Sequence, residues 1–140
     1  MAGYSGTPLV QKLGIKPGHK LALLSAPDGF ERTLGTLPPG VEIAAPTSRT
    51  RNLDVILLFV TSRAELAKRF VKTAKRLDPA GGLWIAWPKR ASGVATDMTE
   101  DGVREVALPA GLVDVKVCAI DETWSGLRCV VRLENRPGKS

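Results

Sequence analysis

The strongest pattern of hydrophobic and polar positions lies between residues 53 and 87. Two runs, 53–60 and 83–87, are apolar apart from Asp54 and lack polar alternation, which is typical of strands buried on both faces. Between them, apolar residues recur at spacings of four, four and three, as on one face of a helix: Leu66, Phe70, Ala74 and Leu77. The pattern predicts two parallel strands joined by a right-handed helical crossover.

Capping residues place the ends of this helix and of a later one. Ser62 and Glu65 form an S-x-x-E capping box, which predicts that the first helix begins after Ser62. The later helix is expected to begin at a cap, either Asp97 or Thr99, and to end at Pro109.

The first 45 residues predict four short elements. We expect a helix over residues 8–13, a strand over 20–25, a helix over 29–34 capped by Asp28, and a strand over 41–44. The second of these strands follows a Pro-Pro-Gly turn, which ends the preceding helix.

The last third of the chain predicts a β-hairpin, with strands over residues 113–120 and 127–133. If Thr123 and Trp124 are the central turn residues, Cys118 and Cys129 face each other across it. The expected fold class is therefore α/β: a three-layer, Rossmann-like domain whose mostly parallel sheet ends in an antiparallel β-hairpin. One domain is expected over residues 1–135, with a flexible tail over 136–140.

The order of elements over residues 20–133 resembles the Rossmann-like fold of S-adenosylmethionine-dependent methyltransferases. Its best marks are the terminal hairpin and the LDPAGGL segment at residues 77–83. That family holds its cofactor with a glycine-rich loop after the first strand and an acidic residue after the second. Here residues 25–29 read SAPDG and residues 44–47 read AAPT. We therefore expect no cofactor, and S-adenosylmethionine in particular is not expected to bind.

The chain also resembles, nearly end to end, a family of short bacterial proteins classed as a domain of unknown function. Four segments carry this resemblance: YSGTPLVQKLGIKPG, LLFVTSRAEL, WPKRASGVATDMTEDGVRE and VDVKVCAIDETWSGL. The resemblance implies a bacterial, cytoplasmic protein without an established activity.

Composition favours an anionic partner. The chain of 140 residues has 20 basic and 14 acidic residues, a net charge of +6 and a pI near 9.7. It has no Lys/Arg run longer than two and few aromatic residues, so nucleic acid is a less favoured partner than a small anion. The sequence predicts no membrane segment and no signal peptide, so the expected location is cytoplasmic.

The few residues suited to metal or redox chemistry give a weak signal. His19 is the single histidine and precedes the first strand, away from the usual ligand side, and no metal site is expected. Cys118 and Cys129 are expected to be reduced and buried, with a redox pair as the alternative. A row of cations on the helix after Ser62 is expected to be solvated, with phosphate contact as the alternative: Lys68, Lys72, Lys75 and Arg76.

Polar side chains should gather where the parallel strands end, because ligands of open parallel sheets bind outside the carboxyl ends of the strands. We call this set the carboxyl-end rim: Asp28, Arg63, Lys89, Arg90, Ser92, Asp121, Glu122, Thr123 and Trp124. Arg63, Lys89 and Arg90 would bind an anion, and Trp124 would form an apolar wall. The alternative is that these are ordinary loop residues that form caps and ion pairs.

Three functions remain open from the sequence. The first is a non-catalytic binding or regulatory module for an anionic small molecule. The second is a small-molecule, transferase-like enzyme that uses carboxylates of the carboxyl-end rim together with Lys89. The third is a nucleic-acid-binding protein that uses the positive net charge. The sequence identifies neither the ligand nor the oligomeric state.

Overall fold

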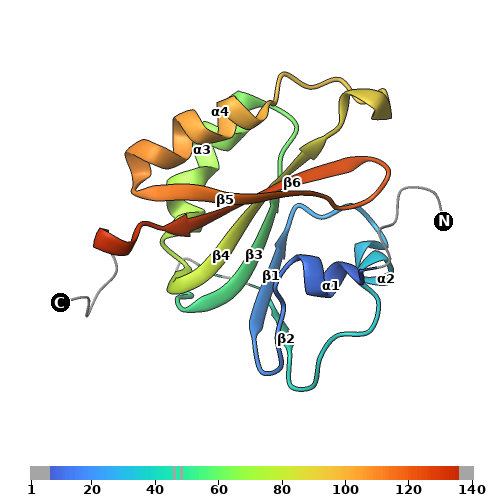
Figure 1. The fold of residues 1–140 in the computed structure, drawn as a ribbon, viewed down its shortest axis with the longest axis vertical. Coiled ribbons are helices and arrows are strands. Elements are labelled where there is room, and N and C mark those ends of the chain that lie inside the picture. The colour runs from blue at the N-terminus through green and yellow to red at the C-terminus, as the bar shows by residue number, and fades with distance from the viewer. Residues whose placement is uncertain (1–6, 46, 48, 136–140) are drawn as a thin grey trace.

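Six strands form one sheet in the order β2-β1-β3-β4-β6-β5 (Figure 1). The structure is a computed structural model that describes residues 7–45, 47 and 49–135. The strands are β1 (Lys20–Leu24), β2 (Glu42–Ala44), β3 (Leu53–Phe59), β4 (Leu77–Pro88), β5 (Leu112–Ala119) and β6 (Trp124–Val131). β2, β1, β3 and β4 are parallel, whereas β6 is antiparallel to both β4 and β5. The expected mostly parallel sheet with a terminal hairpin is confirmed.

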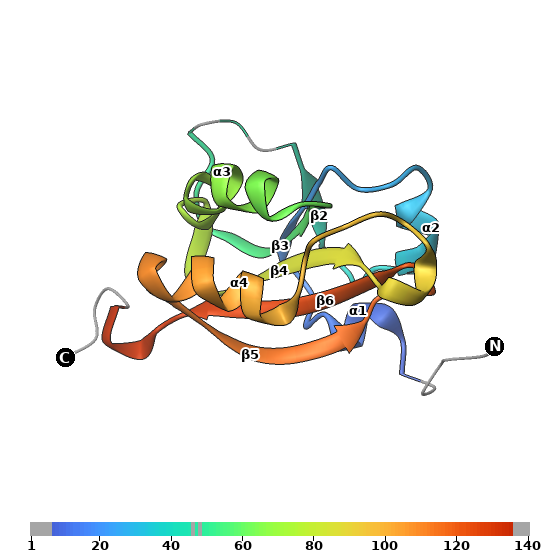
Figure 2. The same ribbon diagram turned by 90° about the horizontal axis from the view of Figure 1, so that it is seen from above.

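Helices cover both faces of this sheet. They are α1 (Leu9–Lys12), α2 (Phe30–Leu34), α3 (Arg63–Ala74) and α4 (Glu100–Ala107), with 3-10 turns at Arg90–Ser92, Leu108–Ala110 and Leu133–Asn135. α3 and α4 pack on one face, and α1 and α2 pack on the other. Figure 2 shows α3 and α1 on opposite sides of the strands. The three-layer arrangement is confirmed, whereas the single domain over 1–135 stays a prediction and the tail at 136–140 lies outside the described residues.

The two buried faces of the central strands explain the absence of polar alternation. In β3, Ile56 and Leu58 pack toward α3 and α4, and Leu57 and Phe59 pack toward α1 and α2. All four side chains are buried. Each burial of such a side chain contributes roughly 1.5–3 kcal/mol, so the parallel strands must be apolar on both sides.

β4 begins earlier than the sequence indicates, and with a large bulge. Leu53 pairs with Leu77 but Val55 pairs with Gly82, so residues 78–81 bulge out opposite Asp54. We expected residues 78–82 to end the helix whose apolar stripe runs to Leu77, and the strand to begin at residue 83; instead α3 ends at Ala74 and Leu77 begins β4. Gly81 makes the bulge sterically possible, because a Cβ at this position would lie 2.6 Å from the Asp54 carbonyl oxygen.

Two of the helix caps agree with the sequence, and one does not. The Ser62 hydroxyl accepts the Glu65 N–H at 3.1 Å, as expected, although the Glu65 carboxylate accepts the N–H of Thr61 instead of that of Ser62. Thr99, not Asp97, caps α4 by accepting the Gly102 N–H at 2.9 Å.

The prediction that Asp28 caps α2 is wrong. The N-cap residue is Gly29, which has a φ of 78° and has no side chain to accept a hydrogen bond. Asp28 therefore lies one residue too early to cap α2, and its exposed side chain extends from the loop.

The hairpin register also differs from the expectation. Cys118 lies opposite Gly126 and Cys129 lies opposite Asp114, so the cysteines do not face each other. Asp121 closes the turn early by accepting the N–H groups of Thr123 and Trp124. A bulge between Asp114 and Lys116 shifts the register again farther along β5, the edge strand.

Candidate functional site

Arg63 of the carboxyl-end rim is already engaged by hydrogen bonds to the segment that leads into α4. Arg63 belongs to the start of α3, but its guanidinium donates to the Asp97 carbonyl oxygen at 3.1 Å and to the Thr99 hydroxyl at 3.0 Å. The Asp97 carboxylate accepts the Arg63 backbone N–H at 2.8 Å. The N-terminus of α3, where Arg63 was expected to bind an anion, thus already has a carboxylate in place.

The part of the carboxyl-end rim that follows β4 does lie beside the hairpin turn. The Lys89 N–H donates to the Thr123 carbonyl oxygen at 2.8 Å, and Pro88 pairs with Trp124 in the sheet. The polar side chains of Asp121 and Ser92 form hydrogen bonds with nearby backbone groups. The Asp121 carboxylate accepts two N–H groups at 2.8 Å each, and the Ser92 hydroxyl donates to the Lys89 carbonyl oxygen at 2.6 Å.

Trp124 is part of an aromatic row that packs at the ends of β3 and β6. Its ring meets Phe59 edge to face at 5.0 Å between centroids, and Phe59 meets Phe30 in the same way at 4.9 Å. Such pairs contribute ~0.5–1.5 kcal/mol beyond the area that they bury. Trp124 therefore supports α2 and the sheet, and it is half-buried.

Arg90 and Glu122, the remaining charged residues of the carboxyl-end rim, are exposed, and Lys89 is half-buried. Within the described part of the chain, none of the three takes part in an ion pair. The role of the carboxyl-end rim in binding an anion stays a prediction.

At the position where a methyltransferase-like fold holds its cofactor, the residues do not fit that cofactor. A pocket of about 400 Å³ lies beside the loop after β1, between Pro27, Phe30 and Ile43. The first N–H of α2, on Phe30, already donates to the Pro27 carbonyl oxygen at 3.1 Å, and Pro27 has no N–H to donate. The charged groups that line this pocket are the carboxylates Asp28 and Glu31. No acidic residue follows β2 at positions 45–48.

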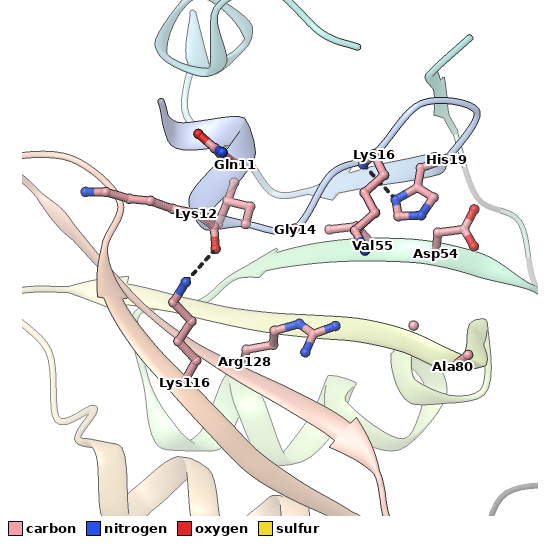
Figure 3. Close-up of a pocket in the computed structure, with 12 residues that line it drawn as sticks. Gln11, Lys12, Gly14, Lys16, His19, Asp54, Val55, Ala80, Lys116 and Arg128 are labelled. Atoms are coloured by element: carbon pink, nitrogen blue, oxygen red, sulfur yellow. Dashed lines mark hydrogen bonds between the residues drawn. The ribbon is translucent and has the colours of Figure 1, made fainter. Parts of the chain in front are cut away.

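A second pocket, of about 350 Å³, lies at the opposite end of the parallel strands (Figure 3). We call it the amino-end pocket: it is bordered by the end of α1, the loop before β1, the start of β3, the β4 bulge and the middle of the hairpin. Its charged or titratable lining residues are Lys12, Lys16, His19, Asp54, Lys116 and Arg128. None of these residues is in the carboxyl-end rim.

Hydrogen bonds fix several groups around the amino-end pocket. The Asp54 carboxylate accepts the Lys20 backbone N–H at 2.8 Å. Nδ1 of His19 accepts the Lys16 N–H at 3.1 Å, so the neutral ring carries its proton on Nε2. The Lys116 ammonium donates to the Lys12 carbonyl oxygen at 3.4 Å.

Sequence reasoning missed the amino-end pocket for two reasons. Its cations are single residues separated by up to about a hundred positions, and His19 was assigned to the end of the sheet without a ligand. The missing signal was the hairpin register. In the observed register Lys116 and Arg128 are direct cross-strand neighbours, whereas the expected turn would have separated them.

The cysteines and potential metal ligands form no further site. Cys129 is buried toward α3 and α4, and burial raises the pKa of its thiol to about 12. Cys118 is half-buried on the other face, beside the cluster of α1 and α2, so its expected full burial is wrong; partial burial raises its pKa as well. Across the described residues, no group of three or more His, Cys, Asp or Glu side chains is arranged to hold a metal ion.

Solved structures with the same architecture define the class of fold. A SAM-dependent methyltransferase from Aquifex aeolicus aligns with a TM-score of 0.61 at 16% identity, over 86% of this chain and 86% of that one. Fibrillarin from Aeropyrum pernix, in complex with S-adenosyl-L-methionine, aligns at 0.55 and 14%, over 91% and 70%. The fibrillarin pre-rRNA processing protein of Methanococcus jannaschii aligns at 0.56 and 16%, over 92% and 70%. The fold is methyltransferase-like and Rossmann-like.

Residues 43–133 match the family described as a protein of unknown function, DUF3052, and the chain belongs to that family. The resemblance to a domain of unknown function is thereby confirmed. No curated protein matches the chain in sequence. Within the described residues, no helix is long and apolar enough to cross a membrane.

Proposed function

We propose that this protein is a non-catalytic binding or regulatory module for a small anionic molecule, built on a methyltransferase-like fold. One observation carries the proposal: the first N–H of α2 is already hydrogen-bonded within the loop after β1. The Phe30 N–H, which begins α2, donates to the Pro27 carbonyl oxygen at 3.1 Å. A methyltransferase-like site needs such amides for its cofactor, because their N–H groups bind its polar atoms.

The charge of the chain supports an anion as the ligand. The net charge is +6, and several cations of the described residues, among them Lys16, Lys89 and Lys116, have no ion pair. Unpaired cations repel each other in the free protein, so an anion that neutralises them binds favourably and stabilises the folded state.

Two titrations test the proposal. In calorimetry, S-adenosylmethionine should bind with a dissociation constant weaker than ~10 μM, which corresponds to roughly −7 kcal/mol. In thermal unfolding, phosphate, glycerol 3-phosphate or citrate should raise the unfolding temperature. A ligand at 100 times its dissociation constant stabilises the folded state by about 2.7 kcal/mol.

Sodium chloride at matched ionic strength is the control for general screening of charge. A dissociation constant for S-adenosylmethionine at or below ~10 μM would contradict the binding-module assignment. Equal effects of the anions and of matched chloride would exclude a specific anion site.

A further inference from the structure

We propose that a groove beside α3 is the anion site, and that it binds the phosphate group of a small phosphate monoester. The groove has a volume of about 320 Å³ and lies between the end of β1 and one side of α3. We call it the α3 groove, and its lining residues are Leu24, Lys68, Arg69, Lys72, Thr73 and Arg76. This inference rests on the proposed function, the binding of a small anion, and adds its location and chemical class.

Two unpaired lysines on one side of α3 are the main observation. Lys68 and Lys72 are neighbours on the helix surface, one turn apart, and both side chains are exposed. Neither side chain forms an ion pair or a hydrogen bond with a described residue. Like charges at this spacing destabilise a helix. An anion bound between them would replace this repulsion with attraction.

Arg69 is held in a way that leaves one edge of its guanidinium available. Its Nη1 donates to the Ser25 hydroxyl at 2.7 Å and to the Glu65 carboxylate at 3.3 Å. Among the described residues, Nε and Nη2 have no hydrogen-bond partner. These two nitrogens share an edge of the planar group, and their parallel N–H groups fit two oxygens of a phosphate. The fixed Nη1 therefore positions a free pair of donors beside the two lysines.

Both arginines of the groove tie α3 to neighbouring loops. Arg76 donates from Nε to the Thr47 carbonyl oxygen at 2.8 Å, and Arg69 reaches Ser25, the residue after β1. Ser25 has a φ of 59°, in the left-handed region that favours glycine. Residues held in such a conformation are concentrated at functional sites. The strained Ser25 thus fixes one of the cations that line the groove.

The charge and the size of the α3 groove fit a phosphate monoester. Glu65 compensates Arg69, whereas the other three cations of the groove form no ion pair with a described residue. A phosphate monoester carries a charge of roughly −1.5 to −2 at neutral pH, and its three oxygens can contact the arginine edge and both lysines together. A carboxylate has only two oxygens. About 320 Å³ lies at the small end of ligand pockets, which span ~300–1,000 Å³.

The amino-end pocket is a weaker candidate, because several of its charged groups already have partners. Arg128 interacts within the protein, and the Lys116 ammonium donates to the Lys12 carbonyl oxygen. The Asp54 carboxylate also brings a negative charge to that pocket. The carboxyl-end rim is the other rival location, since its lysine and its second arginine have no ion pair in the described part of the chain.

Three charge-matched double variants separate the candidate locations. The groove pair is Lys68→Gln with Lys72→Gln, the rim pair is Lys89→Gln with Arg90→Gln, and the pocket pair is Lys16→Gln with Lys116→Gln. Each pair lowers the net charge from +6 to +4. The affinity of each variant for glycerol 3-phosphate is measured by calorimetry, with citrate and a single-stranded oligonucleotide as competing probes.

We expect the groove pair to weaken glycerol 3-phosphate binding at least tenfold, and the rim and pocket pairs to weaken it less than twofold. Lys72→Gln and Lys75→Gln give a matched comparison, because both lysines are exposed on or next to α3 and only Lys72 of the two lines the groove. Lys72→Gln should weaken binding at least threefold, and Lys75→Gln should leave it unchanged. Arg69→Lys keeps the charge but removes the planar donor pair, and should weaken binding at least fivefold at unchanged circular dichroism.

Each contrary result has a distinct meaning. Loss from the rim pair alone or from the pocket pair alone would leave the proposed anion-binding function intact and overturn the α3 groove. Equal losses from all three pairs, or from Lys72→Gln and Lys75→Gln, would indicate diffuse surface charge and overturn it as well. Tighter binding of citrate or of the oligonucleotide would overturn the phosphate monoester. If the wild-type protein binds none of the probes, the proposed function itself fails, and the α3 groove with it.

Discussion

Adding one methyl group should destabilise the fold at one glycine of β4, Gly81, much more than at its neighbour, Gly82. At Gly81, a Cβ would lie 2.6 Å from the Asp54 carbonyl oxygen and 3.0 Å from that of Leu53, and both are backbone atoms of β3. At Gly82, a Cβ would instead meet Nε, Cζ and Nη2 of Arg128, at 2.4, 2.9 and 2.9 Å. The first contact cannot be relieved without moving a strand, whereas the second is relieved when a side chain swings away.

These contacts set the expected magnitudes. In Gly81→Ala, β3 and β4 must separate at the bulge, and overpacking of this kind costs about 1–3 kcal/mol of stability. A domain of this size loses about 4 °C in unfolding temperature per kcal/mol. In Gly82→Ala, the stability should change by less than about 1 kcal/mol, because the methyl group also restricts the unfolded chain.

Urea unfolding of the two variants measures this difference. Gly81→Ala should lower the free energy of unfolding, and Gly82→Ala should leave it nearly unchanged. The reasoning is refuted if Gly81→Ala is as stable as the wild type, or if Gly82→Ala is destabilised as much as Gly81→Ala.

Two further predictions concern the hairpin. Burial raises the pKa of the Cys129 thiol to about 12, from an ordinary value of 9.0. The unfolded chain therefore ionises first, and the free energy of unfolding should fall as the pH rises above 9. Urea unfolding at pH 8 and pH 10 should show a smaller fall for Cys129→Ala than for the wild type, and identical slopes would contradict the assigned burial effect. Asp121→Ala removes the acceptor of two N–H groups and should destabilise the fold by roughly 1–3 kcal/mol. Unchanged stability in this variant would show that the carboxylate is not needed by the turn and is available to a ligand.

The sequence was sufficient for the architecture, because the architecture follows from local patterns. The apolar runs of β3 and β4 and the helical stripe predict the crossover, and Leu66 and Phe70 of that stripe are buried as expected. Ala74 is only half-buried, and Leu77 belongs to β4 and not to α3. Capping chemistry is similarly local, so Ser62 marks the start of α3 correctly. Asp28 failed as a cap because the choice between two neighbouring positions depends on backbone conformation, and Gly29 takes the positive φ.

The candidate site was harder to predict, because it depends on partners that are distant in sequence. Arg63 reads as an available cation until α4 brings Asp97 and Thr99 against it. The hairpin turn, in which Asp121 accepts two N–H groups, is placed differently from the expected one, so every cross-strand pair differs from the expected register. An error of this kind hides the pairing of Lys116 with Arg128, since a hydrophobic pattern specifies the face of a residue and not its neighbour.

The attachment of α1 has a consequence for the order in which the molecule is completed. The Trp84 indole N–H donates to the Leu13 carbonyl oxygen at 3.0 Å across 71 positions, and Lys116 reaches the Lys12 carbonyl oxygen across 104. α1 precedes both partners in the chain, so it is synthesised before them. Its four residues are too few to hold a helix in isolation. α1 therefore completes these contacts only after β4 and β5 have been synthesised, and the amino-end pocket forms only when the hairpin has joined the sheet.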